Sequence, residues 1–552
     1  MSPEQEAGGG EPARFIAVLG AGTMGAGIAQ LACRSGAQTL LFDPFPDALD
    51  KGIERVRDGL SREVARSRIS DAQAREAIEH LSPASELREL EACELVIEAV
   101  PERLELKHEL FGALCSIVAE DCVLASNTSS LLVTAIAAAA THPERVVGMH
   151  FFNPAPLMAL LEVVAGTRSG ERALQIADAT GEAMGKTVIR ATDGPGFLVN
   201  RCNRPFGLEA LRLLQERIAD LETIDRVCRM EGGFRMGPFE LMDLVGVDTG
   251  FEVSRSFYEQ SFGEPRWRPS PIAARHVAAG LHGRKTGRGY YTYEQDAETG
   301  RARHRADDPP PPDPSLTPGE GVVVITGSGS LAEQLRDAAL TAGYEVRAPH
   351  EPSGGVLPAL AIDCTLDPLD ATEPGTGAHG HDGGARLVLC AGASLSRLDE
   401  SASAVGFHAL APLERATLVE LTRGREASAV AAGRAERFFN ALGKHVVWVA
   451  DAPGLVLGRI VCQLINESAF SLGEGVGSAS DIDLGMVLGL SHPRGPLEWA
   501  DEIGIDHVLA VLDGLSDEYR EERYRAAPAL RRMAEAGRLG RLAGAGFFEY
   551  GG

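Results

Sequence analysis

Short apolar runs alternate with helical stretches in the first third of the chain. Candidate strands cover residues 15–19, 38–42, 94–98, 122–126 and 146–149. Strands that alternate with helices are typical of βαβ units, whose strands form a parallel sheet. The part that follows, up to about residue 295, shows helical patterns until its tail. The pattern therefore predicts an α/β domain followed by an all-α domain.

The same plan is repeated in the second half of the chain. The proline-rich segment DDPPPPDPSLTPG (307–319) is a linker by composition and divides the chain near its middle. HFFNPAPLMALLE (150–162) matches HALAPLERATLVE (408–420), and the offset of 258 residues is constant from His150 to Asp248. A constant offset over such a length indicates an internal duplication.

Composition narrows the classes of function. The 552 residues carry a formal net charge of −25, which argues against a nucleic-acid partner, because phosphate binding needs a basic face. The nine cysteines form no CxxC pair, which favours reduced thiols and a cytoplasmic protein. The N-terminus lacks the features of a signal peptide, and no apolar run approaches the roughly 18 residues of a membrane span. We therefore expect no membrane partner, and no motif suggests a metal.

The motif GAGTMG (20–25) follows the apolar run FIAVL and precedes a helical run, as a dinucleotide-binding turn does. Asp43 ends the next strand, where a carboxylate can bind a ribose diol and repel a 2′-phosphate. A glycine-rich turn without a ligand is the alternative. The pattern favours NAD over NADP, and we expect the cofactor to contact Gly20, Gly22, Thr23, Met24, Gly25 and Asp43.

His150 and Glu162 are the candidate catalytic pair. His150 ends the strand-like run VVGMH, and carboxyl ends of parallel strands face the ligand crevice. Glu162 lies in the apolar run LLEVV, where a carboxylate is costly to bury unless it is paired. Pairing would fix the imidazole tautomer and leave the other ring nitrogen to take a substrate proton. A purely structural His–Glu pair is the alternative.

Six motifs together resemble the L-3-hydroxyacyl-CoA dehydrogenase family. They are GAGTMG, VIEAVPERLELKHELF (96–111), SNTSSL (126–131), HFFNPAPLMALLEVV, GPGFLVNR (194–201) and RKTGRGYY (284–291). The two-copy layout without a hydratase domain is similar to the long members of bacterial phenylacetate degradation. The resemblance implies NAD-dependent oxidation of an L-3-hydroxyacyl-CoA, either 3-hydroxyadipyl-CoA or 3-hydroxybutyryl-CoA, in phenylacetate or fatty-acid catabolism.

The family also implies roles for single residues. His150 would be the general base and Glu162 would orient it, while Ser129 and Asn200 would hold the substrate oxygen. The NAD site would also be lined by Glu102, Lys107, Ser129, Asn153 and Lys285. Judged without the family, Ser129 and Asn153 could be turn or cap residues, and Lys107 a solvated helix charge.

Other points stay open at this stage. Arg57, Arg62 and Arg66 could meet the phosphates of CoA or form a solvated face. A non-catalytic nucleotide-binding protein and a dehydrogenase of a hydroxy acid without CoA are alternative functions, because fold does not fix function.

The second copy keeps Ser394, His408 and Glu420 in place of Ser129, His150 and Glu162. Its other ligand positions differ: His350 for Asp43, Thr372 for Lys107, Ala411 for Asn153, Gly458 for Asn200 and Leu542 for Lys285. Residues 367–384 place Pro and Gly where the first copy has a helix. We therefore predict that the second copy binds no NAD and keeps His408 and Glu420 as a buried structural pair.

The expected architecture is a Rossmann domain, a doubly wound parallel sheet, with an all-α C-terminal domain, the pair being duplicated. The segments are a disordered tail (1–13), the NAD-binding domain (14–192), a helical domain (193–296), the linker (297–319), a degenerate Rossmann-like domain (320–450) and a second helical domain (451–552). We expect the two helical domains to pack as an intrachain pseudo-dimer, with a homodimer also possible.

Overall fold

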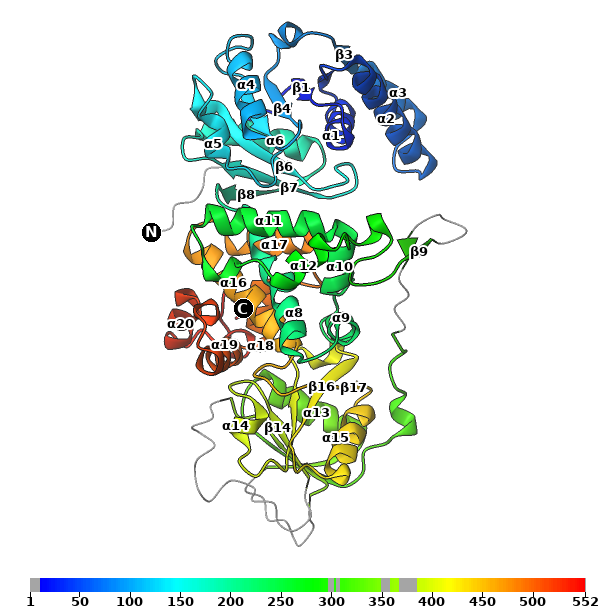
Figure 1. Cartoon of the computed structure of the whole chain (residues 1–552), viewed down its shortest axis with the longest axis vertical. Coiled ribbons are helices and arrows are strands. Elements are labelled where there is room, and N and C mark those ends of the chain that lie inside the picture. The colour runs from blue at the N-terminus through cyan, green and yellow to red at the C-terminus, as the bar shows by residue number, and fades with distance from the viewer. Residues whose placement is uncertain (1–9, 296–301, 304–307, 349–357, 367–384, 552) are drawn as a thin grey trace. The chain divides into compact units, whose positions relative to one another are not determined.

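The computed structural model describes residues 10–295, 302–303, 308–348, 358–366 and 385–551 (Figure 1). The chain forms two compact units. The first unit comprises residues 1–201 and 474–490, and the second comprises residues 202–473 and 491–552. Residues 474–490, expected in the second helical domain, therefore belong with the first unit. Among the described residues, no helix has both the length and the apolar character that crossing a membrane requires.

The first unit is built on an eight-stranded sheet in the order β3-β2-β1-β4-β5-β6-β7-β8. All neighbouring strands are parallel except β6 and β7, which are antiparallel. The strands are β1 (Phe15–Leu19), β2 (Gln38–Phe42), β3 (Leu81–Ala84), β4 (Leu95–Glu98), β5 (Val123–Ser126), β6 (Val146–Phe151), β7 (Leu160–Ala165) and β8 (Thr187–Thr192). The helices are α1 (Thr23–Arg34), α2 (Pro46–Ala65), α3 (Asp71–Glu79), α4 (Leu104–Leu114), α5 (Val133–Ala137), α6 (Glu171–Ala183), α7 (Val199–Cys202) and α17 (Ala479–Leu490).

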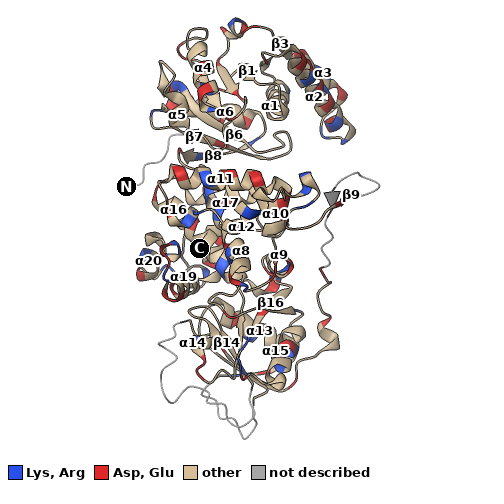
Figure 2. Ribbon diagram, in the orientation of Figure 1, with Lys and Arg blue, Asp and Glu red and all other residues tan. Residues whose placement is uncertain are grey.

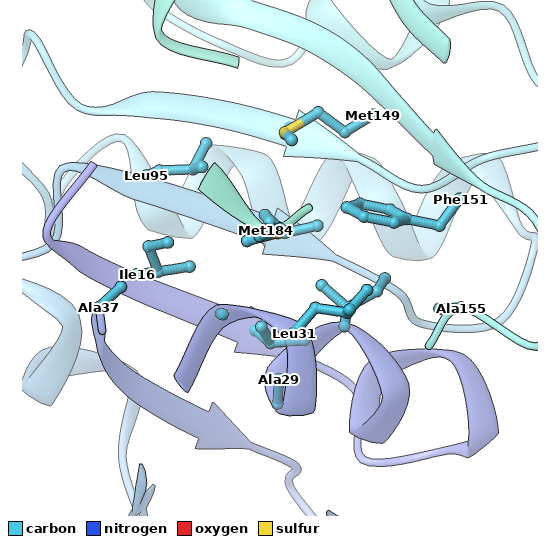
Figure 3. Packing of buried hydrophobic residues seen from close by; sticks show 14 of the residues in the cluster. Ile16, Ala29, Leu31, Ala37, Leu95, Met149, Phe151, Ala155 and Met184 are labelled. Atoms are coloured by element: carbon cyan, nitrogen blue, oxygen red, sulfur yellow. The ribbon is translucent and has the colours of Figure 1, made fainter. Parts of the chain in front are cut away.

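The core explains why the central strands are continuous apolar runs. Side chains of β1, β4 and β6 pack with those of α1 and α6 in one cluster that includes Ile16, Leu31, Leu95 and Met149 (Figure 3). Strands that are covered by helices have no solvent-facing positions and so need no alternating polar residues. The five strands predicted from the sequence are confirmed within two residues at each end.

The second unit contains a seven-stranded sheet in the order β12-β11-β13-β14-β15-β16-β17. This order repeats that of the first sheet without β3, and again only one pair, β15 and β16, is antiparallel. The strands are β11 (Val322–Thr326), β12 (Glu345–Arg347), β13 (Leu360–Asp363), β14 (Ala385–Leu389), β15 (Val405–His408), β16 (Leu418–Arg423) and β17 (His445–Trp448). The helices of this α/β part are α13 (Ser330–Ala342), α14 (Leu395–Leu398) and α15 (Ala429–Ala441).

The rest of the second unit is helical apart from the short strands β9 (Glu294–Gln295) and β10 (Ala302–Arg303). The helices are α8 (Arg204–Glu216), α9 (Leu221–Met230), α10 (Pro238–Val245), α11 (Val247–Gln260), α12 (Pro271–Ala278), α16 (Leu457–Gly473), α18 (Pro496–Ile503), α19 (Ile505–Tyr519) and α20 (Pro528–Glu535). The fully buried Arg459 on α16 joins this helix to α8, because its guanidinium donates to Glu209 at 2.5 Å and to Glu216 at 2.7 Å.

Candidate active site

The glycine motif forms the turn between β1 and α1. Gly20 has a φ of +94°, and a Cβ there would meet the carbonyl oxygen of Ala99 at 2.7 Å. A Cβ on Gly25 would overlap the carbonyl oxygen of Gly20, whereas a Cβ on Gly22 would meet nothing within 4 Å. Gly22 is also the N-cap of α1 and offers no capping side chain. The first N–H groups of α1 are therefore free to bind an anion, such as a pyrophosphate.

Asp43 stabilises the same turn. Its carboxylate accepts hydrogen bonds from the backbone N–H of Ala21 at 2.9 Å and of Phe45 at 3.1 Å. Each carboxylate oxygen keeps a further acceptor site, so the side chain can also bind a ribose diol. The position after β2 and beside the glycine turn fits the predicted role in NAD recognition.

A cavity of about 320 Å³ lies in the first unit. It brings together six of the predicted site residues: Met24, Glu102, Ser129, His150, Asn153 and Asn200. The other lining residues are Ala99, Val100, Asn127, Phe151 and Phe152. Residues that are separated by more than 170 positions in sequence thus face one space.

His150 and Glu162 form a hydrogen-bonded pair beside this cavity. They lie opposite each other on β6 and β7, and Nδ1 of His150 is 2.6 Å from Oε2 of Glu162. The other carboxylate oxygen accepts the backbone N–H groups of Leu198 and Val199 at 3.2 and 2.9 Å. Glu162 is fully buried, and His150 is 6% exposed. Because Nδ1 is engaged, Nε2 is the ring nitrogen that is left to exchange a proton with a ligand.

Glu102 organises the loop that carries Ser129. One of its oxygens accepts hydrogen bonds from the Thr128 hydroxyl at 2.6 Å and from the backbone N–H of Ser129 at 3.0 Å. Burial raises the pKa of Glu102, but the charge of Lys107 and the hydrogen bonds from this loop outweigh burial and lower it overall. Glu102 therefore stays ionised at neutral pH and holds the loop in place.

Lys107 is not a solvated helix charge. It is fully buried, and its ammonium lies 2.7 Å from Glu98 and 3.2 Å from Glu102. A buried charge persists only when it is paired, and these two carboxylates provide the pairing, so the alternative interpretation of Lys107 as a solvated charge is wrong. Lys107 does not line the cavity but supports Glu102, which does.

Lys285 lies in the second unit, where it pairs with Asp248 at 2.6 Å.

The arginines considered as candidate partners of CoA phosphates lie in different places. Arg62 and Arg66 line a second cavity of the first unit, of about 310 Å³, whereas Arg57 does not. Arg55 and Arg68 line the same cavity. Figure 2 shows Lys and Arg mixed with acidic residues on α2 and α3.

Asn127 and Lys186 are polar residues at or near the site that the sequence analysis did not single out. Asn127 lines the main cavity, and its side-chain oxygen accepts the N–H of Phe151 at 2.8 Å, which ties the end of β5 to the end of β6. Lys186 donates to the carbonyl oxygens of Ala155 and Met158 at 2.6 and 2.7 Å and so holds the loop after His150. A signal existed for Lys186, because Lys444 occupies the same place in the second copy.

Helix α17 packs closely against residues next to the His150–Glu162 pair. A Cβ on Gly489 would meet Leu160 at 2.8 Å and Phe152 at 3.3 Å, and a Cβ on Gly485 would meet Val199 at 2.8 Å. Only glycine lets the helix approach this closely. Residues from the second half of the chain therefore support the site of the first half.

The corresponding residues of the second copy correct one prediction. His408 and Glu420 are buried, as expected, but Nδ1 of His408 has no hydrogen-bond partner among the described residues, and Nε2 lies 3.1 Å from Nε2 of His507. Glu420 accepts the backbone N–H groups of Val456 and Leu457, both at 2.8 Å, one at each of its two oxygens. The two residues are buried separately and not as a pair.

Gly458 explains the changed position of His408. A Cβ at Gly458 would overlap the His408 ring, so the ring fills the space that opens where the first copy has Asn200. Ser394 is buried, and its hydroxyl lies 3.2 Å from that of Ser396. His350 and Thr372 lie outside the described residues.

Comparisons with known proteins agree with this geometry. A family model described as "3-hydroxyacyl-CoA dehydrogenase, NAD binding domain" matches residues 15–194, and its partner, the "C-terminal domain" model, matches residues 196–293 and again 454–550. The chain is 34% identical to the 3-hydroxyadipyl-CoA dehydrogenase of Escherichia coli K12, over 94% of this chain and 97% of that protein.

Two further relatives cover different extents of the chain. A probable 3-hydroxybutyryl-CoA dehydrogenase of Bacillus subtilis is 38% identical over 51% of this chain and 97% of its own length. The crystal structure of a 3-hydroxybutyryl-CoA dehydrogenase from Escherichia coli K12 superposes with a TM-score of 0.77 and 32% identity, over 95% of this chain and 98% of that chain.

Proposed function

The chain belongs to the 3-hydroxyacyl-CoA dehydrogenase family, and from that premise we propose that His150, oriented by Glu162, is the general base of an NAD-dependent oxidation of L-3-hydroxyacyl-CoA to 3-ketoacyl-CoA. The observation that carries the proposal is the 2.6 Å contact of the buried His150–Glu162 pair at the edge of the 320 Å³ cavity. This contact makes Nε2 the free proton acceptor and lets Glu162 stabilise the imidazolium that forms.

Ser129 and Asn200 complete the proposed reaction centre. Both line the cavity with His150, and both can donate a hydrogen bond to the substrate oxygen. Donors that are already in place stabilise charge on that oxygen as the carbonyl forms. His150 takes the hydroxyl proton at Nε2, and the hydride of C3 would leave to the nicotinamide that NAD supplies when bound.

The residues present fit NAD. The uncapped N-terminus of α1 and the open space over Gly22 suit a pyrophosphate, and Asp43 suits an unphosphorylated ribose. Glu102 and Asn153 line the same cavity and would face the rest of the cofactor. For Lys107 we propose that it positions Glu102. For Lys285 we propose a place in the NAD site, as the family implies.

The second cavity of the first unit supports a CoA subsite. Arg55, Arg62, Arg66 and Arg68 line it, together with Pro154 of the loop that follows His150. Guanidinium groups are the preferred partners of phosphate oxygens, because they bind them in a bidentate manner. We propose that this cavity receives the phosphates of CoA. Arg57 takes no part in it.

The similar proteins are a 3-hydroxyadipyl-CoA dehydrogenase and a probable 3-hydroxybutyryl-CoA dehydrogenase, and their names suggest the acyl group of the substrate. We propose one of these two thioesters as substrate, in phenylacetate or fatty-acid catabolism, in the cytoplasm. Mixing the protein with NAD and each thioester should produce the absorbance of NADH. The proposal fails if neither thioester is oxidised while a free 3-hydroxy acid is.

We also propose the six segments set out from the sequence as the domains, except that residues 474–490 pack with the first unit, and we propose that the helical domains form a pseudo-dimer. Contacts that are repeated with the two halves exchanged are typical of a two-fold interface. Two kinds of contact are repeated in this way. The hydrogen bond from Thr192 N to Val476 O has its counterpart in the bond from Ala450 N to Ile218 O, both at 2.8 Å. The ion pair of Arg201 with Glu474 has its counterpart in that of Arg459 with Glu216, both at 2.7 Å. A homodimer of the whole chain remains a separate prediction, to be tested by sedimentation.

A further inference from the structure

A third cavity, of about 130 Å³, lies within the first helical domain and is lined mainly by apolar residues of α8, α10 and α11. A single water needs roughly 10–15 Å³ in the same measure, so the cavity has room for several heavy atoms. The polar side chains that line it are Asn203, Arg204, Ser254 and Ser270. Arg204, at the start of α8, carries the only full charge among the lining residues.

Arg204 has no acidic partner within the part of the chain that the structure describes. Its guanidinium donates one hydrogen bond, to the hydroxyl of Ser254 at 3.3 Å, and lies 4.8 Å from the centre of the Phe257 ring. Its Nε atom is buried and has no hydrogen-bond partner in the described ranges of the chain. Burial lowers the pKa of Arg204 to about 10, so the side chain still carries its charge at neutral pH.

Two arginines of the same region show the usual way of compensating a buried guanidinium. Other arginines of the helical domains pair with carboxylates, for example Arg229 with Glu240 at 2.9 Å and Arg266 with Glu467 at 2.9 Å. A cation that is held beside apolar walls without a counter-charge is costly, and an anionic ligand would remove that cost. The cavity therefore combines apolar walls with one donor group that lacks its acceptor.

The second copy lacks this arrangement. Cys462 stands in place of Arg204, Leu512 in place of Ser254, and Leu515 in place of Phe257. Both halves need a packed helical core, but only the half with the candidate active site has placed an arginine here. This difference argues for a ligand-binding role and against a role in packing alone.

We propose that Arg204 binds the terminal carboxylate of a dicarboxylic acyl group, and that this contact sets the preference for 3-hydroxyadipyl-CoA over acyl groups that end in a methyl. The inference rests on the proposed function and narrows its substrate class. Arg204 follows Asn200 by four residues, so the chain alone keeps their Cα atoms within about 14 Å. In a six-carbon acyl group the terminal carboxylate lies only three carbons beyond the reacting C3.

The test compares two thioesters of equal length, 3-hydroxyadipyl-CoA and 3-hydroxyhexanoyl-CoA, which differ in the terminal carboxylate. The readout is the ratio of their kcat/KM values. The unmodified protein should favour the dicarboxylic substrate, and Arg204→Met should lower the ratio by about 10- to 150-fold, the range expected for a lost hydrogen bond to a charged group. Arg204→Lys should retain part of the preference, because it keeps the charge.

The matched control is Arg255→Met. Arg255 is half-exposed on α11 next to Ser254 and pairs with Glu252 and Glu259, so its loss should leave the ratio unchanged. If Arg204→Met does not fold, Arg204→Gln gives the same comparison with a polar side chain. An unchanged ratio in a folded Arg204 variant, or equal use of both thioesters by the unmodified protein, overturns the inference alone. Failure to oxidise either thioester, together with failure to oxidise 3-hydroxybutyryl-CoA, overturns the proposed function itself.

Discussion

His408 lies directly opposite Glu420 on β15 and β16, yet its ring meets Nε2 of His507 at 3.1 Å instead of the carboxylate. In the first sheet, the equivalent His150 and Glu162 are joined at 2.6 Å. The backbone register is the same in both sheets, and the side chains differ because Gly458 leaves space for the histidine ring. The second site has thus lost its hydrogen-bonded pair while keeping both residues.

The two histidines should respond differently to the same substitution. His150→Ala should lower kcat by about 10²–10⁴-fold, because a positioned general base contributes that much. His408→Ala should leave turnover near normal, with at most a loss of stability. NADH formation measures both. Substantial activity in His150→Ala that disappears in the double variant would show that the second copy is active.

Gly458→Ala should destabilise the protein. The added methyl group would overlap the His408 ring, and such overpacking costs about 1–3 kcal/mol of unfolding free energy. The control is Gly433→Ala on α15, where a Cβ meets nothing within 4 Å, and this change should stabilise the helix slightly. Combining Gly458→Ala with His408→Ala should recover part of the loss, because the two sites are coupled. Additive losses would contradict the contact.

Glu231→Gln should change how stability depends on pH. Burial, followed by the charge of Glu420, raises the pKa of Glu231, and burial raises the pKa of Glu420 to about 8. A raised carboxyl pKa contributes stability that is present below about pH 4.5 and is lost as pH rises toward 8. The variant should therefore lose less stability than the unmodified protein between pH 5 and pH 8, by roughly 1–3 kcal/mol.

Urea unfolding at the two pH values measures this difference. Glu333→Gln serves as the control, because Glu333 is exposed on α13 and should leave the pH dependence unchanged. If the free energy of unfolding changes with pH by the same amount in Glu231→Gln and in the unmodified protein, Glu231 does not titrate in this range.

Asp43→Ala should narrow the preference for NAD over NADP. The variant loses a carboxylate that can bind the ribose diol and repel a 2′-phosphate. It also loses the hydrogen bonds from Ala21 and Phe45, so activity with both cofactors should fall, and the ratio of kcat/KM values is the informative quantity. Asp47→Ala, exposed in the first turn of α2, is the control. Equal efficiency with both cofactors in the unmodified protein would refute the assignment.

The sequence alone predicted the buried strands well, because Ile16–Leu19 and its neighbours are continuous apolar runs. It missed three strands of the first sheet: β7, which was noted only as the apolar run LLEVV, and β3 and β8, which lie at the edges and contain polar residues such as Ser82 and Arg190. Edge strands lack the two covered faces that produce a recognisable apolar run.

For the site, motif spacing predicted the pair His150–Glu162 and the glycine turn. It could not predict the buried ion pair of Lys107 or the rotation of His408, because both depend on neighbours that are distant in sequence. Glu98 provides the counter-charge of Lys107, and Gly458 provides the space for the His408 ring. Local sequence patterns carry no information about such tertiary contacts.

Helix α17 has a consequence for the history of this chain. This helix belongs in sequence to the second half, in which the His–Glu contact is lost. Its glycines, however, lie against Phe152 and Val199 of the first half, in which the contact is kept. A gene truncated after the linker would encode a first half that lacks this support and would need a second molecule to supply it. The second copy can therefore lose its His–Glu contact while its helix stays under selection, and the fusion becomes an evolutionary step that is hard to reverse.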